Sequence, residues 1–303
     1  MSQFIEKASC GANDASGSFI PEALFQLFFR RKENPQERDL ELFFGVASRV
    51  KANVQFMKDQ YGIDVEMHRI VKEEKTEMVD LKKLGLVEAL RATNRIREEI
   101  VKYPPSYIKG IDIKKFRLLR SITHKRHHDV GGLAFTGGDV YITGGSSDVY
   151  DRQVLHHELF HRRDYEHSEL KESVPVIGHI IDIIRERMLD HNWATLNSKG
   201  RDVYARESFQ TVSQAYPLTH RPLGFARTYG LKTEWEDRAT VAEYLMTNPE
   251  WLLREGESDR VLLAKMKFVM RLLHKSSGGL MNAAYFKDLV AGKVVEGYWP
   301  ANA

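Results

Sequence analysis

Residues 148–161 read DVYDRQVLHHELFH and end in the pattern His-Glu-x-x-His. The two outer residues of this pattern, His157 and His161, are four positions apart. Positions with this spacing lie on one face of an α-helix, so the two imidazoles can converge on one metal ion. A zinc ion lowers the pKa of its bound water, and Glu158 can reach that water without being a ligand. We therefore predict a helix with His157 and His161 as metal ligands and Glu158 as general base.

A polar helix face that carries stray histidines is the alternative explanation of this pattern. Val154, Leu155 and Phe160 give the helix an apolar side, which favours a helix packed within a domain. Gly137-Gly138 separates two short apolar runs before it, and paired glycines supply the positive φ of a β-hairpin turn.

The residues around the motif predict an α+β fold, with a sheet packed on the motif helix. Helical spacing of apolar residues and short runs typical of strands define the other elements. The predicted helices are 21–31, 38–60, 86–103, 175–189, 233–246 and 250–275, the last in one or two pieces. The predicted strands are 61–70, 116–122, 133–136 and 139–143.

Two residues compete for the place of third metal ligand. In HELFHRRDYEH, His167 has the spacing of the last histidine of the metzincin pattern HExxHxxGxxH, but Asp164 replaces the glycine that turns the chain out of the helix. Glu236 lies on the core-facing stripe of the predicted helix 233–246, where an unpaired carboxylate is costly. Acidic residues are also common at helix starts, so the residues alone leave both candidates open.

Three segments together resemble a known group of metallopeptidases. HHELFHRRD (156–164), GFARTYG (224–230) and EDRATVAEYLM (236–246) are similar to segments of gluzincins of the anthrax lethal factor type, and of a bacterial family described as putative zinc-binding metallopeptidases. In that group the motif helix is followed by a Tyr-Gly segment and a second helix that opens with a glutamate ligand. The resemblance covers about residues 84–275, and WATLN (193–197) adds to it.

This resemblance implies a zincin-like catalytic domain, with a small mixed sheet packed on the motif helix. The helical spacing of apolar residues in 21–31 and 38–60 predicts a mainly helical N-terminal region before that domain. It implies one Zn²⁺ per chain, with Glu236 as third ligand beside the two histidines. Tyr229 would donate its hydroxyl to the oxyanion that forms in peptide hydrolysis. Asp237 and Asp164 would orient zinc-binding histidines.

Two departures from the group stand out. Thr240 occupies the position of a second glutamate in the family pattern, and His161 and Glu236 are 75 positions apart (236 − 161), which suggests an inserted helix around 175–189.

Gluzincins bind substrate as an antiparallel strand added to the edge of the sheet. We expect residues 139–143 to form this edge strand.

The resulting hypothesis is a zinc-dependent endopeptidase that acts on a protein or peptide substrate. A metal-stabilised regulatory or binding protein without turnover is one alternative, and a DNA-associated protease is another. Residues 114–128 are rich in basic side chains, yet the net charge of the chain is only +3, so nucleic acid is not the favoured partner.

Composition sets the remaining expectations. The chain has 303 residues and a single cysteine, Cys10, so neither an intrachain disulfide nor a thiolate metal cluster can form. No secretory signal and no apolar run of about 18 residues is present, which predicts a cytoplasmic protein without a membrane span, or export as an effector without a signal. The expected regions are 1–83, 84–275 and 276–303; no pattern specifies an oligomeric state.

Overall fold

A computed structural model describes residues 37–67, 78–82, 84–124, 128–135, 137–144, 147–168, 189, 191–197, 200–204 and 221–300. The predicted helix at 21–31 lies outside these residues, as does the predicted helix at 175–189 apart from its last residue.

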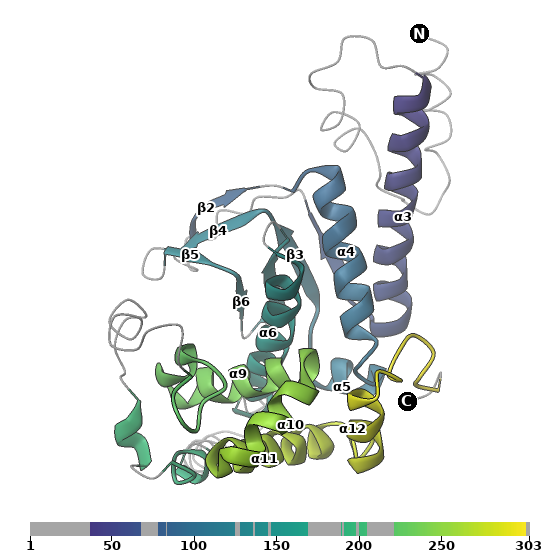
Figure 1. Ribbon diagram of the computed structural model, residues 1–303. Helices are drawn as coiled ribbons and strands as arrows, with labels where there is room; N and C mark the ends of the chain where they lie inside the picture. The colour runs from purple at the N-terminus through teal and green to yellow at the C-terminus, as the bar shows by residue number, and fades with distance from the viewer. Residues whose placement is uncertain are drawn as a thin grey trace, which may run out of the picture.

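Two helices form the N-terminal side of the described fold. α3 (Glu37–Tyr61) and α4 (Leu86–Ile100) run side by side, and both were predicted from apolar periodicity (Figure 1). α4 begins after Gly85, whose backbone N–H donates to the Glu88 carboxylate at 2.7 Å. The short helix α5 (Pro105–Gly110) follows and begins with proline, which suits the first turn of a helix.

A four-stranded mixed sheet lies beside these helices, in the order β1-β3-β7-β6. β1 (Asp64–Glu66), β3 (Lys115–Leu119) and β7 (Asp139–Thr143) are parallel, and β6 (Gly132–Ala134) pairs antiparallel with β7. The predicted hairpin is confirmed, and Gly138 has the positive φ of +90° that its turn requires. The expectation that residues 139–143 form an edge is wrong, because β7 is internal and β6 is at the edge.

The single strand predicted at 116–122 is divided in two. β3 ends at Leu119, and β4 (Ser121–His124) joins a second, antiparallel sheet in the order β2-β4-β5. The partners of β4 are β2 (Met78–Lys82) and β5 (His128–Val130).

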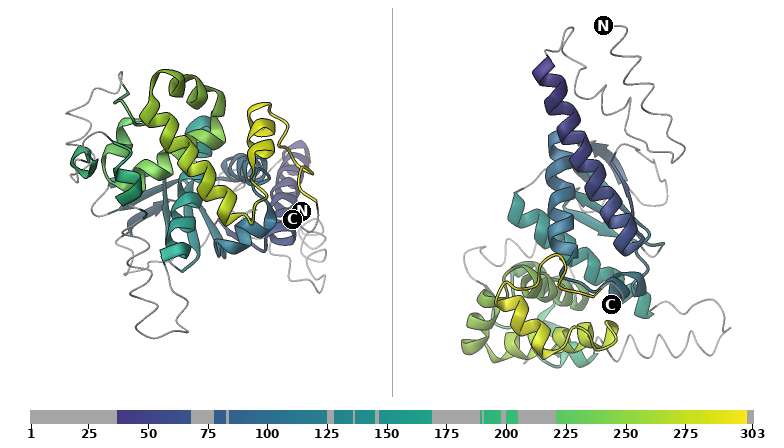
Figure 2. Two further views of the ribbon diagram at one scale, coloured as in Figure 1. Left: turned by 90° about the horizontal axis from the view of Figure 1, so that it is seen from below. Right: turned by 90° about the vertical axis from the view of Figure 1, so that its right-hand side faces the viewer.

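The motif helix, α6 (Asp148–Ser168), lies between the first sheet and the C-terminal helices (Figures 1 and 2). α9 (Glu234–Thr247) packs along it, and α10 (Pro249–Ser258) and α11 (Arg260–Ser276) follow. Asp259 separates these last two helices, because its side chain accepts a hydrogen bond from Leu262 N at 3.0 Å and caps α11. Short 3₁₀ helices are present at Gly200–Val203 (η2) and Thr228–Leu231 (η3).

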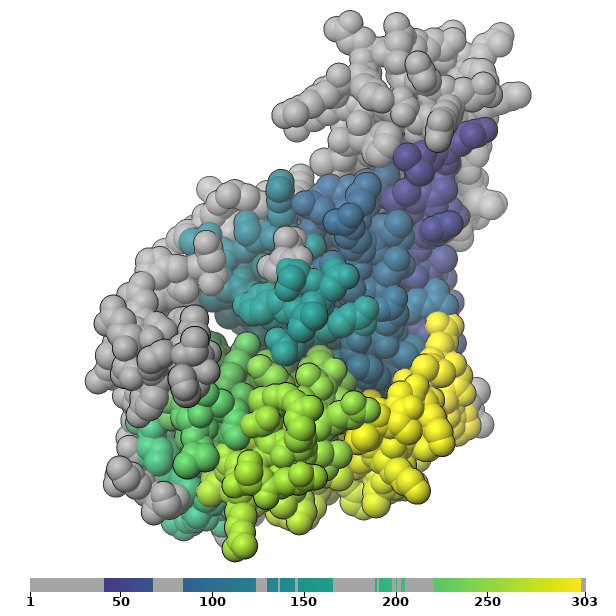
Figure 3. Space-filling model, viewed as in Figure 1, coloured from purple at the N-terminus to yellow at the C-terminus, as the bar shows by residue number. Residues whose placement is uncertain are grey.

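One hydrophobic core joins the early and late parts of the chain. Met57 from α3 and Tyr285 from α12 (Ala283–Val290) belong to the same buried cluster as the sheet and α6. Figure 3 shows the C-terminal helices, green to yellow, packed directly against the blue and teal part of the molecule. Described residues from both terminal regions, such as Met57 and Tyr285, therefore contribute to this core, while the division into three regions stays a prediction. Among the described residues, no helix has the length and apolarity needed to cross a membrane.

Candidate metal centre

Three predicted metal ligands converge between α6 and α9. His157 Nε2 lies 3.0 Å from His161 Nε2, and Glu236 Oε2 lies 2.9 Å from the first nitrogen and 3.3 Å from the second. Zinc bonds of about 2.0–2.1 Å at tetrahedral angles would separate ligand atoms by roughly 3.3 Å. Two imidazole nitrogens and one carboxylate oxygen, all within 4.8 Å of one another, therefore form a group that could hold a metal ion of this size.

The start of α9 places Glu236. Thr233 is the N-cap residue, and its hydroxyl accepts a hydrogen bond from Glu236 N at 3.2 Å. The carboxylate lies in the first helical turn, where the helix dipole stabilises negative charge. Burial alone would raise the pKa of Glu236, but hydrogen bonds from His157 and His161 outweigh it and hold the pKa well below its usual range. The carboxylate is therefore ionised at neutral pH.

Tyr229 lies next to this group, in the 3₁₀ helix η3. Its hydroxyl donates to Glu236 Oε1 at 3.1 Å, and its ring centroid is 5.7 Å from that of His157. Burial and the neighbouring carboxylate of Glu236 raise the pKa of Tyr229 well above its ordinary value. The phenol therefore keeps its proton and can act only as a neutral hydrogen-bond donor or acceptor.

Glu158 faces the edge strand β6. A Cβ atom on Gly132 would come within 2.7 Å of Glu158 Cγ, so only glycine permits this close approach of strand and helix. Burial raises the pKa of Glu158, against the opposing charges of His161 and His157 and a hydrogen bond from the Ala134 backbone. A raised pKa makes this carboxylate a stronger proton acceptor than an exposed glutamate.

Glu243 is a residue of this centre that the sequence analysis did not identify. Its fully buried carboxylate accepts a hydrogen bond from His157 Nδ1 at 3.0 Å and from Arg227 Nη2 at 3.0 Å. The sequence does contain a pattern that could have identified it: Glu236 and Glu243 lie seven positions, or two helical turns, apart on the same face of the predicted helix. Thr240, one turn after Glu236, instead donates its hydroxyl to the Glu236 carbonyl oxygen at 2.6 Å.

Among the described residues, Asp237 contacts no histidine. Its Oδ2 atom accepts hydrogen bonds from Trp193 Nε1 at 2.9 Å, from the Tyr204 hydroxyl at 2.9 Å and from Lys265 Nζ at 2.6 Å. All four side chains are buried. Asp237 thus anchors the first turn of α9 to the surrounding segments.

Asp164 also has partners other than the predicted histidine. Its carboxylate accepts hydrogen bonds from Arg163 Nη1 at 2.7 Å and from Arg238 Nε at 2.9 Å. Burial would raise the pKa of Asp164, but the charges of Arg238 and Arg163 outweigh burial and lower it. The pair with Arg238 ties α6 to α9 directly beside the candidate metal centre.

The helix α6 continues past Asp164 without a break and ends at Ser168. The metzincin arrangement needs the chain to leave the helix at this point so that its last histidine returns to the metal. On a continuous helix, His167 stands six positions beyond His161 and lies on a different face. The main chain therefore does not form the metzincin arrangement.

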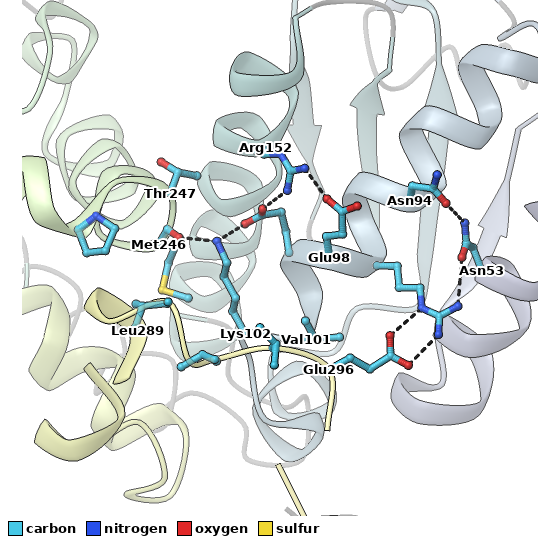
Figure 4. A pocket seen from close by; sticks show the side chains of 16 residues that line it. Asn53, Asn94, Glu98, Val101, Lys102, Arg152, Met246, Thr247, Leu289 and Glu296 are labelled. Carbon is cyan, nitrogen blue, oxygen red and sulfur yellow. Dashed lines mark hydrogen bonds and ion pairs between the residues drawn. The ribbon is translucent and has the colours of Figure 1, made fainter. Parts of the chain in front are cut away.

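His156 belongs to a polar cluster on the opposite side of α6. Its ring is fully buried and contacts Glu99 Oε2 at 2.7 Å and the Tyr103 hydroxyl at 2.8 Å. Glu99 also pairs with Arg152 and Lys102, which line a cavity of about 570 Å³ (Figure 4). His156 thus packs in the core and is not one of the converging ligands.

Comparison with known proteins supports this description at the level of the fold. No family model and no curated protein matches the sequence. The structure is similar to a crystal structure of a "putative zinc-binding metallo-peptidase" from Bacteroides caccae, with a TM-score of 0.51 and 14% sequence identity. The similarity covers 86% of this chain and 94% of that chain. The protein therefore has a metallopeptidase-like α+β fold with a small mixed sheet.

Proposed function

We propose that the protein is a zinc-dependent endopeptidase of the gluzincin type, related to the lethal factor group. The observation that carries this proposal is the convergence of His157, His161 and Glu236, with Glu158 one residue along the same helix. The donor set matches the two histidines and one glutamate of known catalytic zinc sites, which leave a fourth position for water.

Zinc bound by these three residues would polarise a water molecule and lower its pKa towards neutrality. Glu158 takes a proton from the attacking water and delivers it to the leaving amine, for which its raised pKa suits it. Tyr229 keeps its proton at neutral pH, so its hydroxyl can donate to the oxygen of the peptide carbonyl as negative charge develops there.

The edge strand β6 is the proposed place of the peptide substrate. Its outer side faces away from β7 in the strand order, and Gly132 and Ala134 bring it against Glu158. An extended peptide could add to this edge by main-chain hydrogen bonds, which would place a scissile carbonyl near the base.

Two variants test the proposal. Purified Glu236→Ala protein should lose stoichiometric zinc, because a catalytic zinc site depends on all three protein ligands. Glu158→Gln protein should keep zinc but lose peptide cleavage, which comparison of new N-termini in a proteome treated with each protein would detect. Full zinc content in Glu236→Ala would remove this residue from the site. A biological effect of Glu158→Gln equal to that of the wild type would favour a regulatory protein without turnover.

A further inference from the structure

The two carboxylate oxygens of Glu236 have different partners. Oε2 faces His157 and His161, whereas Oε1 accepts a hydrogen bond from the Tyr229 hydroxyl at 3.1 Å and pairs with Lys232 Nζ at 3.5 Å. Lys232 lies at the C-terminal end of η3, and its side chain is only 15% exposed. One oxygen is thus directed to the metal ligands and the other to a tyrosine and a lysine.

Lys232 also contacts Tyr229 itself. Its ammonium lies 3.4 Å from the tyrosine hydroxyl oxygen and 4.9 Å from the centre of the aromatic ring. An ammonium group has three donors and can serve two acceptors at once. Arg227 lies 5.2 Å from the same ring centre, but its guanidinium donates to Glu243. Lys232 is therefore the cation that contacts both Tyr229 and Glu236.

Tyr229 has a single hydroxyl proton, and in this structure the proton is directed to Glu236 Oε1. A donor to the reacting carbonyl must release that oxygen, and a carboxylate oxygen of a side chain that is only 17% exposed is costly to leave without a partner. Lys232 is already within ion-pair distance of Oε1, so it can hold the oxygen after Tyr229 turns away.

We infer that Lys232 is a positioning residue that keeps Glu236 Oε1 paired while Tyr229 turns its hydroxyl to the substrate. This inference rests on the proposed peptidase function for Tyr229. By holding Oε1, Lys232 would also leave Oε2 as the oxygen available to a metal ion, since carboxylates can otherwise bind ions through either one or both oxygens.

Measurements of zinc affinity, which need no substrate, test whether Lys232 and Tyr229 can each stabilise Glu236 Oε1. Chelator competition is measured for Lys232→Met, Tyr229→Phe and the double variant, and the absorption spectrum of bound Co²⁺ reports the ligand geometry. Each single variant leaves Oε1 one partner, so its affinity should change only a few-fold. The double variant should bind zinc roughly 10- to 100-fold more weakly and show an altered Co²⁺ spectrum. Lys232→Arg should restore affinity in the Tyr229→Phe background.

Lys267→Met is the matched control, because this lysine is exposed on α11 and should have no effect on zinc affinity. Far-UV circular dichroism checks that each variant is folded, and Lys232→Gln replaces Lys232→Met if the latter does not fold. A double variant that binds zinc as tightly as the wild type would overturn the inference.

Peptide hydrolysis then tests the release of Tyr229. Without Lys232, the tyrosine is the remaining donor to Oε1, so kcat should fall about 100-fold, as for loss of an oxyanion donor, while KM stays the same. At saturating zinc, the loss of kcat in the double variant should be smaller than the product of the two single losses. Independent, multiplicative losses would contradict the inference. A wild type that cleaves no peptide refutes the proposed function, whereas the zinc measurements still decide whether Lys232 holds Glu236.

Discussion

Replacement of Glu243 by glutamine should weaken zinc binding while leaving the fold intact. Glu243 is fully buried beneath His157, and its Oε2 atom accepts from both His157 Nδ1 and Arg227. A carboxylate in this place fixes the tautomer and ring orientation of a ligating histidine and increases its basicity. Glutamine has nearly the same shape and keeps a carbonyl acceptor, so the change removes the charge and little else.

The expected magnitude follows from that single charge. A hydrogen bond to a charged group contributes about 1.5–3 kcal/mol, against about 0.5–1.5 kcal/mol for a neutral one. The centres of these ranges differ by roughly 1.3 kcal/mol, which corresponds to a change in Kd of nearly tenfold. Glu243→Ala removes the acceptor altogether and should approach the roughly 100-fold upper value for lost partners of metal ligands. Arg227 is 29% exposed and can turn to water, so the fold should tolerate both changes.

Competition with a chromophoric chelator measures the zinc Kd, and urea unfolding of the metal-free proteins checks stability. Glu255→Gln is the matched control. Glu255 lies on α10, its Oε2 atom forms an ion pair with Arg221 Nη2 at 3.2 Å, and it contacts none of the proposed ligands. Wild-type affinity in Glu243→Gln, or an equal loss in Glu255→Gln, would refute the reasoning.

Three further changes have defined outcomes. Burial would raise the pKa of Asp164, but Arg238 and Arg163 lower it below the value of about 3.9 in the unfolded chain. The ionised carboxylate therefore stabilises the fold fully above this value, and the stabilisation is lost as the pH falls through the lower pKa of the folded state. Asp164→Asn should thus be less stable at pH 7 but lose less stability on acidification, as urea unfolding at each pH would show. Gly132→Ala places a methyl group 2.7 Å from Glu158 Cγ, so kcat should fall about 100-fold at unchanged zinc content by atomic absorption. Lys265→Met leaves the Asp237 carboxylate buried without its cation and should cost about 3–5 kcal/mol in urea unfolding; an unchanged midpoint would contradict that role.

Much of the fold follows from local patterns in the sequence. The helices α3, α4, α9 and α11 have apolar residues at helical spacing, and the glycine pair marks the hairpin of β6 and β7. The position of β7 inside the sheet was not predictable in the same way, because strand order depends on pairing with β3, whose residues lie 24 positions earlier than their partners (139 − 115). The break after Leu119 also depends on tertiary pairing, since the strands on its two sides join different sheets.

In the candidate site too, local spacing predicted some residues and not others. Helical spacing predicted His157 and His161, whereas Glu236 was identified as a ligand by a resemblance in distant segments. Glu243 was missed because its partner is 86 positions away, and a buried glutamate has the same sequence pattern whether it supports a histidine or pairs with a cation. Asp237 was predicted to orient a histidine because it follows Glu236 in the sequence. Glu236 contacts the histidines, but the side chain of Asp237 is directed to Lys265.

The ion pair of Asp164 with Arg238 lowers the chain entropy that is lost when the metal ligands are brought together. Joining His161 to Glu236 closes a loop of 75 residues, which costs on the order of 4 kcal/mol for a flexible chain. The Asp164–Arg238 pair spans 74 residues and closes almost the same loop. Folding alone therefore restricts this loop, and a metal ion that arrives afterwards does not have to gather its ligands from an open chain. Chelation should accordingly remove the ion and leave the two helices joined.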